Sequence, residues 1–171
     1  MSYATALLAT HANLLGTLDN LITKAEGHAK GEALLQARLA EDMFPLSTQI
    51  RFTVTQVIVA LDRLGNLGIA SLDESEITTF AEAHERIAAA REMVANTDPS
   101  TWPAANDLVE FTLPNGMAFA MQAHEYCRDW ATAQFYFHLM AVYTILRMQG
   151  LPIGKIDCVG YMLKYMKQPA A

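Results

Sequence analysis

Two histidines stand in apolar stretches of the sequence, where an imidazole could form a hydrogen bond, bind a ligand or hold a metal. His138 lies in the run QFYFHLMAV (134–142), one of the most apolar parts of the chain. Gln134 precedes it by four residues, and residues four apart share a face of a helix. Three interpretations stay open here: a buried hydrogen-bonded pair, a small-molecule pocket, or the remnant of a metal site.

His11 raises the same question near the start of the chain. It stands in a stripe with Leu7, Leu14 and Leu18, at alternating spacings of three and four residues. A buried ring nitrogen without a partner costs ~1–3 kcal/mol, so an imidazole on this stripe needs one. His11 is therefore a second candidate, after His138.

Other motifs that carry chemistry are missing from the sequence. It has no phosphate-binding glycine loop, no paired-cysteine zinc motif and no helix with the HExxH pattern. Cys127 and Cys158 do not have the spacing of metal ligands, and we expect both to be free thiols. The chemistry of the chain therefore depends on its histidines and on their polar neighbours.

Four long helices are predicted to position these residues. Apolar side chains recur at helical spacing over 3–26, 46–64, 75–98 and 128–149. Asp42 can cap the second helix, with Pro45 in its first turn, and Ser75 can cap the third. Shorter helical segments are expected over 31–40 and 155–167.

One β signal interrupts this helical pattern. Val109, Phe111 and Leu113 alternate with polar residues, Asn115-Gly116 forms a turn, and a second strand returns over 117–121. An isolated hairpin is marginal in water, so this one must lie against the helices. We predict an all-α fold in one domain, residues 1–171: a four-helix bundle with a small β-hairpin inserted before the last long helix.

Charge and hydropathy limit the classes of partner. A formal net charge of −6 disfavours nucleic acid, whose phosphates require a basic surface. No apolar run reaches the ~18–20 residues of a membrane span, and no leader pattern opens the chain, so a cytoplasmic protein is expected.

Two segments of the chain resemble a known superfamily. They are ARLAEDMFPLSTQI (37–50) and FYFHLMAVYTILRMQGLPIGKIDCVG (135–160). Both are similar to the DinB/YfiT-like superfamily and, more narrowly, to a bacterial family catalogued as domain of unknown function number nineteen ninety-three. The resemblance covers the whole chain. It implies a four-helix bundle, frequently dimeric, in which three histidines hold a divalent metal: an HxxxH pair on the last long helix and one residue from helix two.

Carried onto this chain, the resemblance leaves one of the three histidines in place. The second histidine of the HxxxH pair falls on His138 and the first falls on Gln134. The helix-two ligand falls near Gln49, or on Asp42 if the register differs. A neutral amide is a weak ligand for metals that imidazole favours, so we expect no metal. The alternative is Zn or Ni held by His138, His11 and Asp42.

These observations lead to three functional hypotheses. The first is a non-catalytic or small-ligand-binding homodimer with a degenerate metal site, its pocket lined by His138, Gln134, Gln49 and Tyr136. The second is a metal-dependent transferase or hydrolase with a non-standard site around His138. The third is a structural homodimer that pairs through an apolar helix face, which nine methionines and 52% apolar residues would suit.

Overall fold

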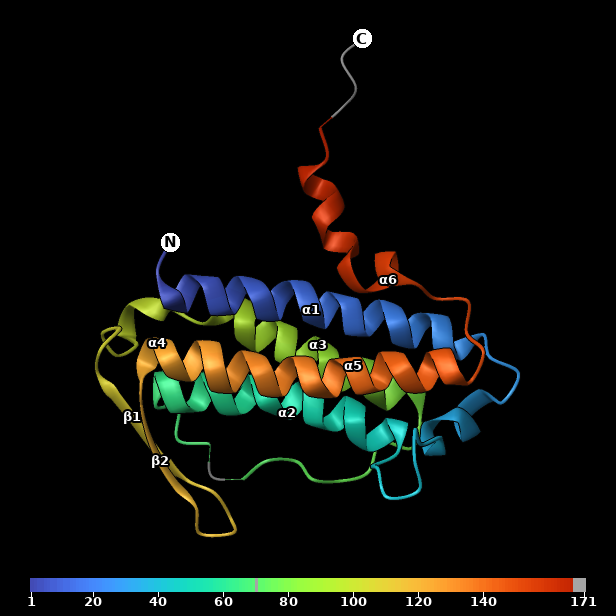
Figure 1. Cartoon of the computed structure of the whole chain (residues 1–171), viewed down its shortest axis with the longest axis horizontal. Helices are drawn as coiled ribbons and strands as arrows, with labels where there is room; N and C mark the ends of the chain where they lie inside the picture. Colours follow the sequence, from blue (N-terminus) through green and yellow to red (C-terminus); the bar gives the residue numbers. More distant parts are fainter. Residues whose placement is uncertain (70, 168–171) are drawn as a thin grey trace.

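Four long helices, packed side by side, dominate the computed structural model, which describes residues 1–69 and 71–167 (Figure 1). α2 packs chiefly against α5 and α3, and α1 packs chiefly against α3. The predicted four-helix bundle is therefore confirmed. Its helices are α1 (Tyr3–Glu26), α2 (Leu46–Gly65), α3 (Phe80–Asn96) and α5 (Thr132–Met148).

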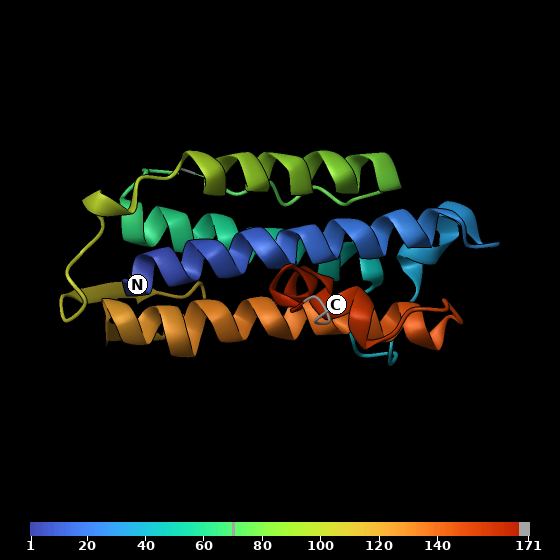
Figure 2. The same cartoon turned by 90° about the horizontal axis from the view of Figure 1, so that it is seen from above.

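The directions of the helices require one long connection. α1 and α5 run one way along the bundle, and α2 and α3 run the other way (Figures 1 and 2). Asn66, at φ 50°, ends α2 in the left-handed region, and residues 66–69 and 71–79 lead back along the bundle to α3. Ile77, 1% exposed, anchors this connection in the core. The connection therefore covers the seam between two parallel helices.

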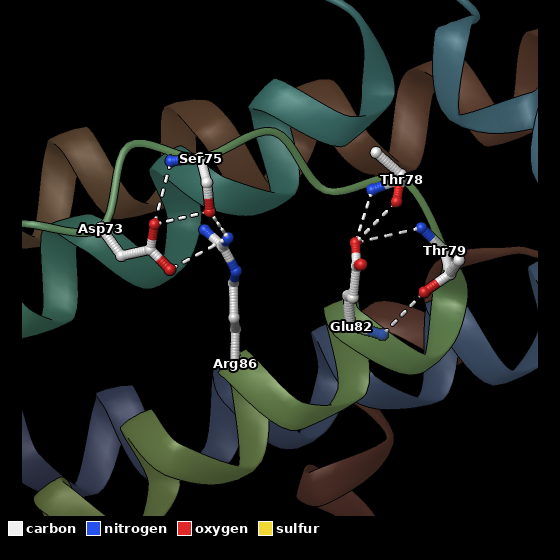
Figure 3. A network of polar contacts seen from close by, with 6 residues as sticks. All are labelled: Asp73, Ser75, Thr78, Thr79, Glu82 and Arg86. Carbon is white, nitrogen blue, oxygen red and sulfur yellow. Dashed lines mark hydrogen bonds and ion pairs between the residues drawn. The ribbon is translucent and has the colours of Figure 1, made fainter.

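The third helix begins later than the sequence predicted. Thr79 is its N-cap: its Oγ1 accepts a hydrogen bond from the Glu82 backbone N–H at 3.1 Å, and the Glu82 carboxylate accepts one from the Thr79 N–H (Figure 3). This capping box satisfies two free N–H groups at once. The predicted cap, Ser75, is wrong, since its hydroxyl and N–H both donate to the Asp73 carboxylate.

The second helix begins where it was predicted, but its predicted cap needs correction. α2 begins at Leu46 after Pro45, which occupies the N-cap position in an extended conformation without a side-chain cap. Pro45 thus precedes the first turn instead of lying within it. Asp42 is exposed in a turn three residues before that cap and does not cap the helix.

The core is built from the apolar stripes of the helices. α1 alone buries Leu15, Leu18 and Leu21 completely. Each such side chain contributes ~1.5–3 kcal/mol of transfer free energy, so packing of these faces outweighs the intrinsic helix propensities. His11 is 0% exposed within the same stripe.

The predicted hairpin is present at one end of the bundle, and its turn extends beyond the helices (Figure 1). β1 (Leu108–Thr112) pairs antiparallel with β2 (Ala118–Gln122), and Gly116, at φ 87°, supplies the turn. Phe111 contacts the rings of Tyr126 and Trp130, and the Arg63 guanidinium lies 3.9 Å from the Phe111 ring centroid. These contacts stabilise a hairpin that would be marginal alone.

Short helical elements complete the fold. The last long helix is entered through α4 and a π-helical turn, η3, so its regular part begins at Thr132 and not near Arg128. No helix in residues 1–69 and 71–167 is long and apolar enough to cross a membrane. The short elements are η1 (Gly31–Gln36), η2 (Pro99–Thr101), α4 (Ala123–Glu125), η3 (Tyr126–Ala131), α6 (Lys155–Val159) and η4 (Gly160–Tyr165).

Candidate functional site

His138 on α5 faces α2, where it forms a hydrogen bond with Gln49. The His138 Nδ1 atom lies 2.9 Å from the Gln49 Oε1 atom, and Gln49 is itself only 2% exposed. An amide oxygen can only accept a hydrogen bond, so the ring carries its proton on Nδ1. The Nε2 lone pair is then left free to accept a hydrogen bond from another group.

The charge state of His138 follows from its surroundings. Burial lowers the pKa of His138 to about 4, because the protonated ring would lose its hydration. The imidazole is therefore neutral at pH 7. A neutral ring with one fixed N–H and one free lone pair is a directional hydrogen-bond acceptor.

Aromatic rings pack against the His138 imidazole. The centroid of Phe52 lies 5.0 Å from that of the His138 ring, and the centroid of Phe137 lies 5.2 Å away. Phe44 packs edge-on against Phe52 at 5.2 Å. Sequence reasoning missed Phe52, although it stands three residues after Gln49 and hence on the same side of α2. The site therefore joins one polar pair to an apolar wall.

Gln134 and Tyr136, the other predicted lining residues, lie differently. Gln134 is half-buried one turn before His138, but Gln49, from across the bundle, is the hydrogen-bond partner of the ring. Tyr136 lies two residues from His138, on nearly the opposite side of α5, beside Tyr161 of η4. Burial, followed by the proximity of Tyr161, raises the pKa of Tyr136. Tyr136 does not belong to the Gln49–His138 site.

His11 and Asp42 do not join His138 in a metal site. The His11 ring packs against Phe135 with centroids 5.3 Å apart, and neither of its nitrogens has a hydrogen-bond partner. Asp42 is exposed before α2. Across residues 1–69 and 71–167, no three His, Cys, Asp or Glu side chains lie close enough together to hold a metal ion. His138, His11 and Asp42 therefore do not form the group that the alternative Zn or Ni site would need.

The three-histidine centre of the superfamily also does not fit this donor set. Gln49, at the helix-two position, directs its oxygen at the His138 ring. One imidazole and the amide of Gln134 remain, and a neutral amide is a weak ligand for these metals. The position that holds a metal in the superfamily is here a hydrogen-bonded pair.

Comparisons with known proteins agree with this fold. A search of curated proteins found no match to the chain. A solved structure described as a DinB family member protein from Shewanella denitrificans is 27% identical in sequence, with a TM-score of 0.81. The alignment covers 95% of this chain and 93% of that one. The family model described as Domain of unknown function (DUF1993) matches residues 3–159, and the chain belongs to that DinB-like family.

Proposed function

We propose that this protein is a non-catalytic module that binds a small ligand at the Gln49–His138 pair. The observation that carries the proposal is the 2.9 Å hydrogen bond between Gln49 Oε1 and His138 Nδ1. It fixes the ring and its tautomer, and it directs the acceptor atom Nε2 away from Gln49. Such pre-organisation favours binding, because little freedom is lost when the ligand arrives.

The acidity of His138 favours binding over catalysis. A general base works best when its pKa lies near the operating pH, and that of His138 lies at about 4. A ring that is such a weak base at neutral pH accepts a hydrogen bond without removing the proton. The chemistry that fits the site is recognition of an intact ligand.

The site suggests the kind of ligand that it would recognise. A group that donates a hydrogen bond suits the free Nε2 atom, and a flat apolar body suits the neighbouring rings of Phe52 and Phe137. Phenol combines both features in one small molecule. Toluene has the same shape but lacks the donor, and is the matched control.

Calorimetry with phenol and toluene tests this proposal. We expect phenol to bind more tightly than toluene to the unaltered protein, by about tenfold for one hydrogen bond of ~1.4 kcal/mol. His138→Phe keeps an aromatic ring but loses the acceptor, so it should remove this preference. Equal affinity for both compounds in the unaltered protein would contradict the proposal.

The same protein should be titrated with zinc and nickel chlorides. Binding of one metal ion per chain that is lost in His138→Phe would favour the alternative, a metal-dependent transferase or hydrolase. We expect no such binding, since only one imidazole stands at the position of the superfamily's three ligands.

We further propose that the module is a homodimer that pairs through the outer face of α5. Phe137 and Met140 are 62% and 41% exposed there, which is unusual for large apolar side chains on one helix. Leu39 and Met43, from the connection between η1 and α2, line a shallow groove of about 440 Å³ together with Phe137 and Met140. The same face on a second copy would cover it in a two-fold arrangement.

Sedimentation of two charged variants tests the pairing. Met140→Glu places a carboxylate in the groove and should give a monomer. Ala88→Glu adds the same charge to an exposed position of α3 and should leave a dimer intact. A monomeric unaltered protein, or one whose dimer survives Met140→Glu, would refute this interface.

A further inference from the structure

A cavity that neither Gln49 nor His138 lines lies between α2 and α3, under the connection that joins them. It has a volume of about 200 Å³. Its walls are largely apolar, with Val54 and Ile58 from α2, Leu72 from the connection and Ala89 from α3. Two arginines, Arg51 and Arg86, line the same small space. Paired cations beside an apolar cavity are unusual and call for an anionic group.

The protein itself supplies one anionic group, the Asp73 carboxylate. The Asp73 carboxylate lies 3.0 Å from the Arg86 guanidinium, which also donates a 2.5 Å hydrogen bond to the Ser75 hydroxyl (Figure 3). The Arg86 side chain is 19% exposed, whereas that of Asp73 is 66% exposed. A shielded cation is thus paired with a carboxylate that solvent reaches freely.

Arg51 carries the second positive charge of the cavity. Its guanidinium lies 4.7 Å from the centroid of the Phe52 ring, and it forms no ion pair within residues 1–69 and 71–167. The pKa of Asp73 is lowered first by hydrogen bonds from Ser75 and then by the charges of Arg86 and Arg51. One carboxylate is therefore within electrostatic reach of both arginines.

We propose that this cavity binds a small monocarboxylate that carries a short apolar chain. The ligand carboxylate would take the place of Asp73 on Arg86 and be neutralised further by Arg51. Guanidinium groups suit this role, because their N–H donors match both oxygens of a carboxylate. The apolar chain would lie along Val54, Ile58 and Leu72. Asp73 is then an internal competitor, which can turn to solvent because it is exposed and belongs to a connection instead of a helix.

The exchange is feasible because exposed ion pairs are weak. A solvent-accessible pair typically contributes ~0–1 kcal/mol, so the Asp73–Arg86 contact is easily given up. A ligand carboxylate would make the same kind of ion pair, and its apolar chain would add transfer free energy that Asp73 does not provide. Inorganic phosphate could satisfy the arginines but leaves the apolar walls unused.

Calorimetric titration with hexanoate, hexanol and inorganic phosphate tests this proposal. We expect hexanoate to bind at one site per chain, at least tenfold more tightly than hexanol or phosphate. Arg86→Gln and Arg51→Gln should each weaken hexanoate binding by tenfold or more. If hexanol or phosphate bound as tightly as hexanoate, the proposal would be overturned.

Asp73→Asn gives the sharpest result, since it removes the competing charge at an exposed position. We expect hexanoate affinity to rise several-fold in this variant. A fall in affinity, or no detectable binding in either the unaltered protein or Asp73→Asn, would also overturn the proposal. His138→Phe should bind hexanoate normally, so this site and the one at Gln49–His138 can fail independently.

Discussion

His11 and His138 are both imidazoles on apolar helix stripes, and burial lowers the pKa of each to about 4. They differ in whether another helix supplies a hydrogen-bond partner for the ring. His138 is half-buried and its Nδ1 atom is bonded to Gln49. His11 is 0% exposed, and both of its nitrogens lack a partner. Two equally neutral histidines can thus have opposite roles, one as a directed acceptor and the other as a buried group that weakens the fold.

The largest expected effect is loss of stability in acid, to which both rings contribute, and His11 is the more deeply buried of the two. Its folded pKa of about 4 lies below the ordinary value of 6.5, so between these values the unfolded chain takes up a proton that the folded chain does not. Stability is therefore retained above pH 6.5 and falls as the pH drops toward 4. A shift of this size corresponds to about 3 kcal/mol.

Urea unfolding at several pH values between ~4 and ~7 measures this loss. His11→Leu is the matched control, because it fills a similar volume without a titratable group. The free energy of unfolding should depend less on pH in His11→Leu than in the unaltered protein. Identical pH slopes in the two proteins would show that His11 does not determine acid stability.

The next effect concerns the Gln49–His138 pair. His138→Leu leaves the buried Gln49 oxygen without its donor, and we expect a loss of ~1–3 kcal/mol in the free energy of unfolding. Replacing both partners, as in Gln49→Leu with His138→Leu, should recover part of that loss. A double-mutant cycle measures the coupling. Additive losses would mean that the pair contributes no interaction to the fold.

The smallest effect has the opposite sign and separates the two histidines most simply. His11→Leu removes two unpartnered ring nitrogens from the core, so it should stabilise the protein by about 1 kcal/mol at pH 7. Thermal and urea unfolding both report this change. Destabilisation by His11→Leu as large as that by His138→Leu would mean that His11 has a partner after all, and the comparison would fail.

Local pattern was sufficient to predict the bundle and the hairpin. Helical stripes and the Asn115-Gly116 turn depend on neighbours within a few residues, and both predictions are confirmed. The predicted caps failed where two candidates compete within a few positions, because Thr79 has Glu82 three residues later to complete a capping box and Ser75 does not. The spacing of Tyr136 and His138 was itself enough to place them on different sides of the helix.

Contacts between helices could not be predicted in the same way. The sequence pattern suggested Gln134 as the partner of His138, since four residues separate them, whereas the bonded partner lies 89 residues away on α2. Arg51 and Arg86 line one cavity only because α2 and α3 pack side by side, which the sequence pattern does not reveal. The resemblance to the DinB-like superfamily pointed to Gln49, because it carries information about positions that meet in three dimensions.

We propose that His138 is a neutral, Nδ1-protonated acceptor in a ligand site. Long-range proton–nitrogen NMR of the imidazole rings at pH 7 tests it most directly. We expect an Nδ1–H tautomer for His138, no protonation above about pH 5, and a phenol-induced shift of its Nε2 resonance with His11 unchanged. An Nε2–H tautomer, a ring that is charged at pH 6, or a phenol response at His11 alone would contradict it.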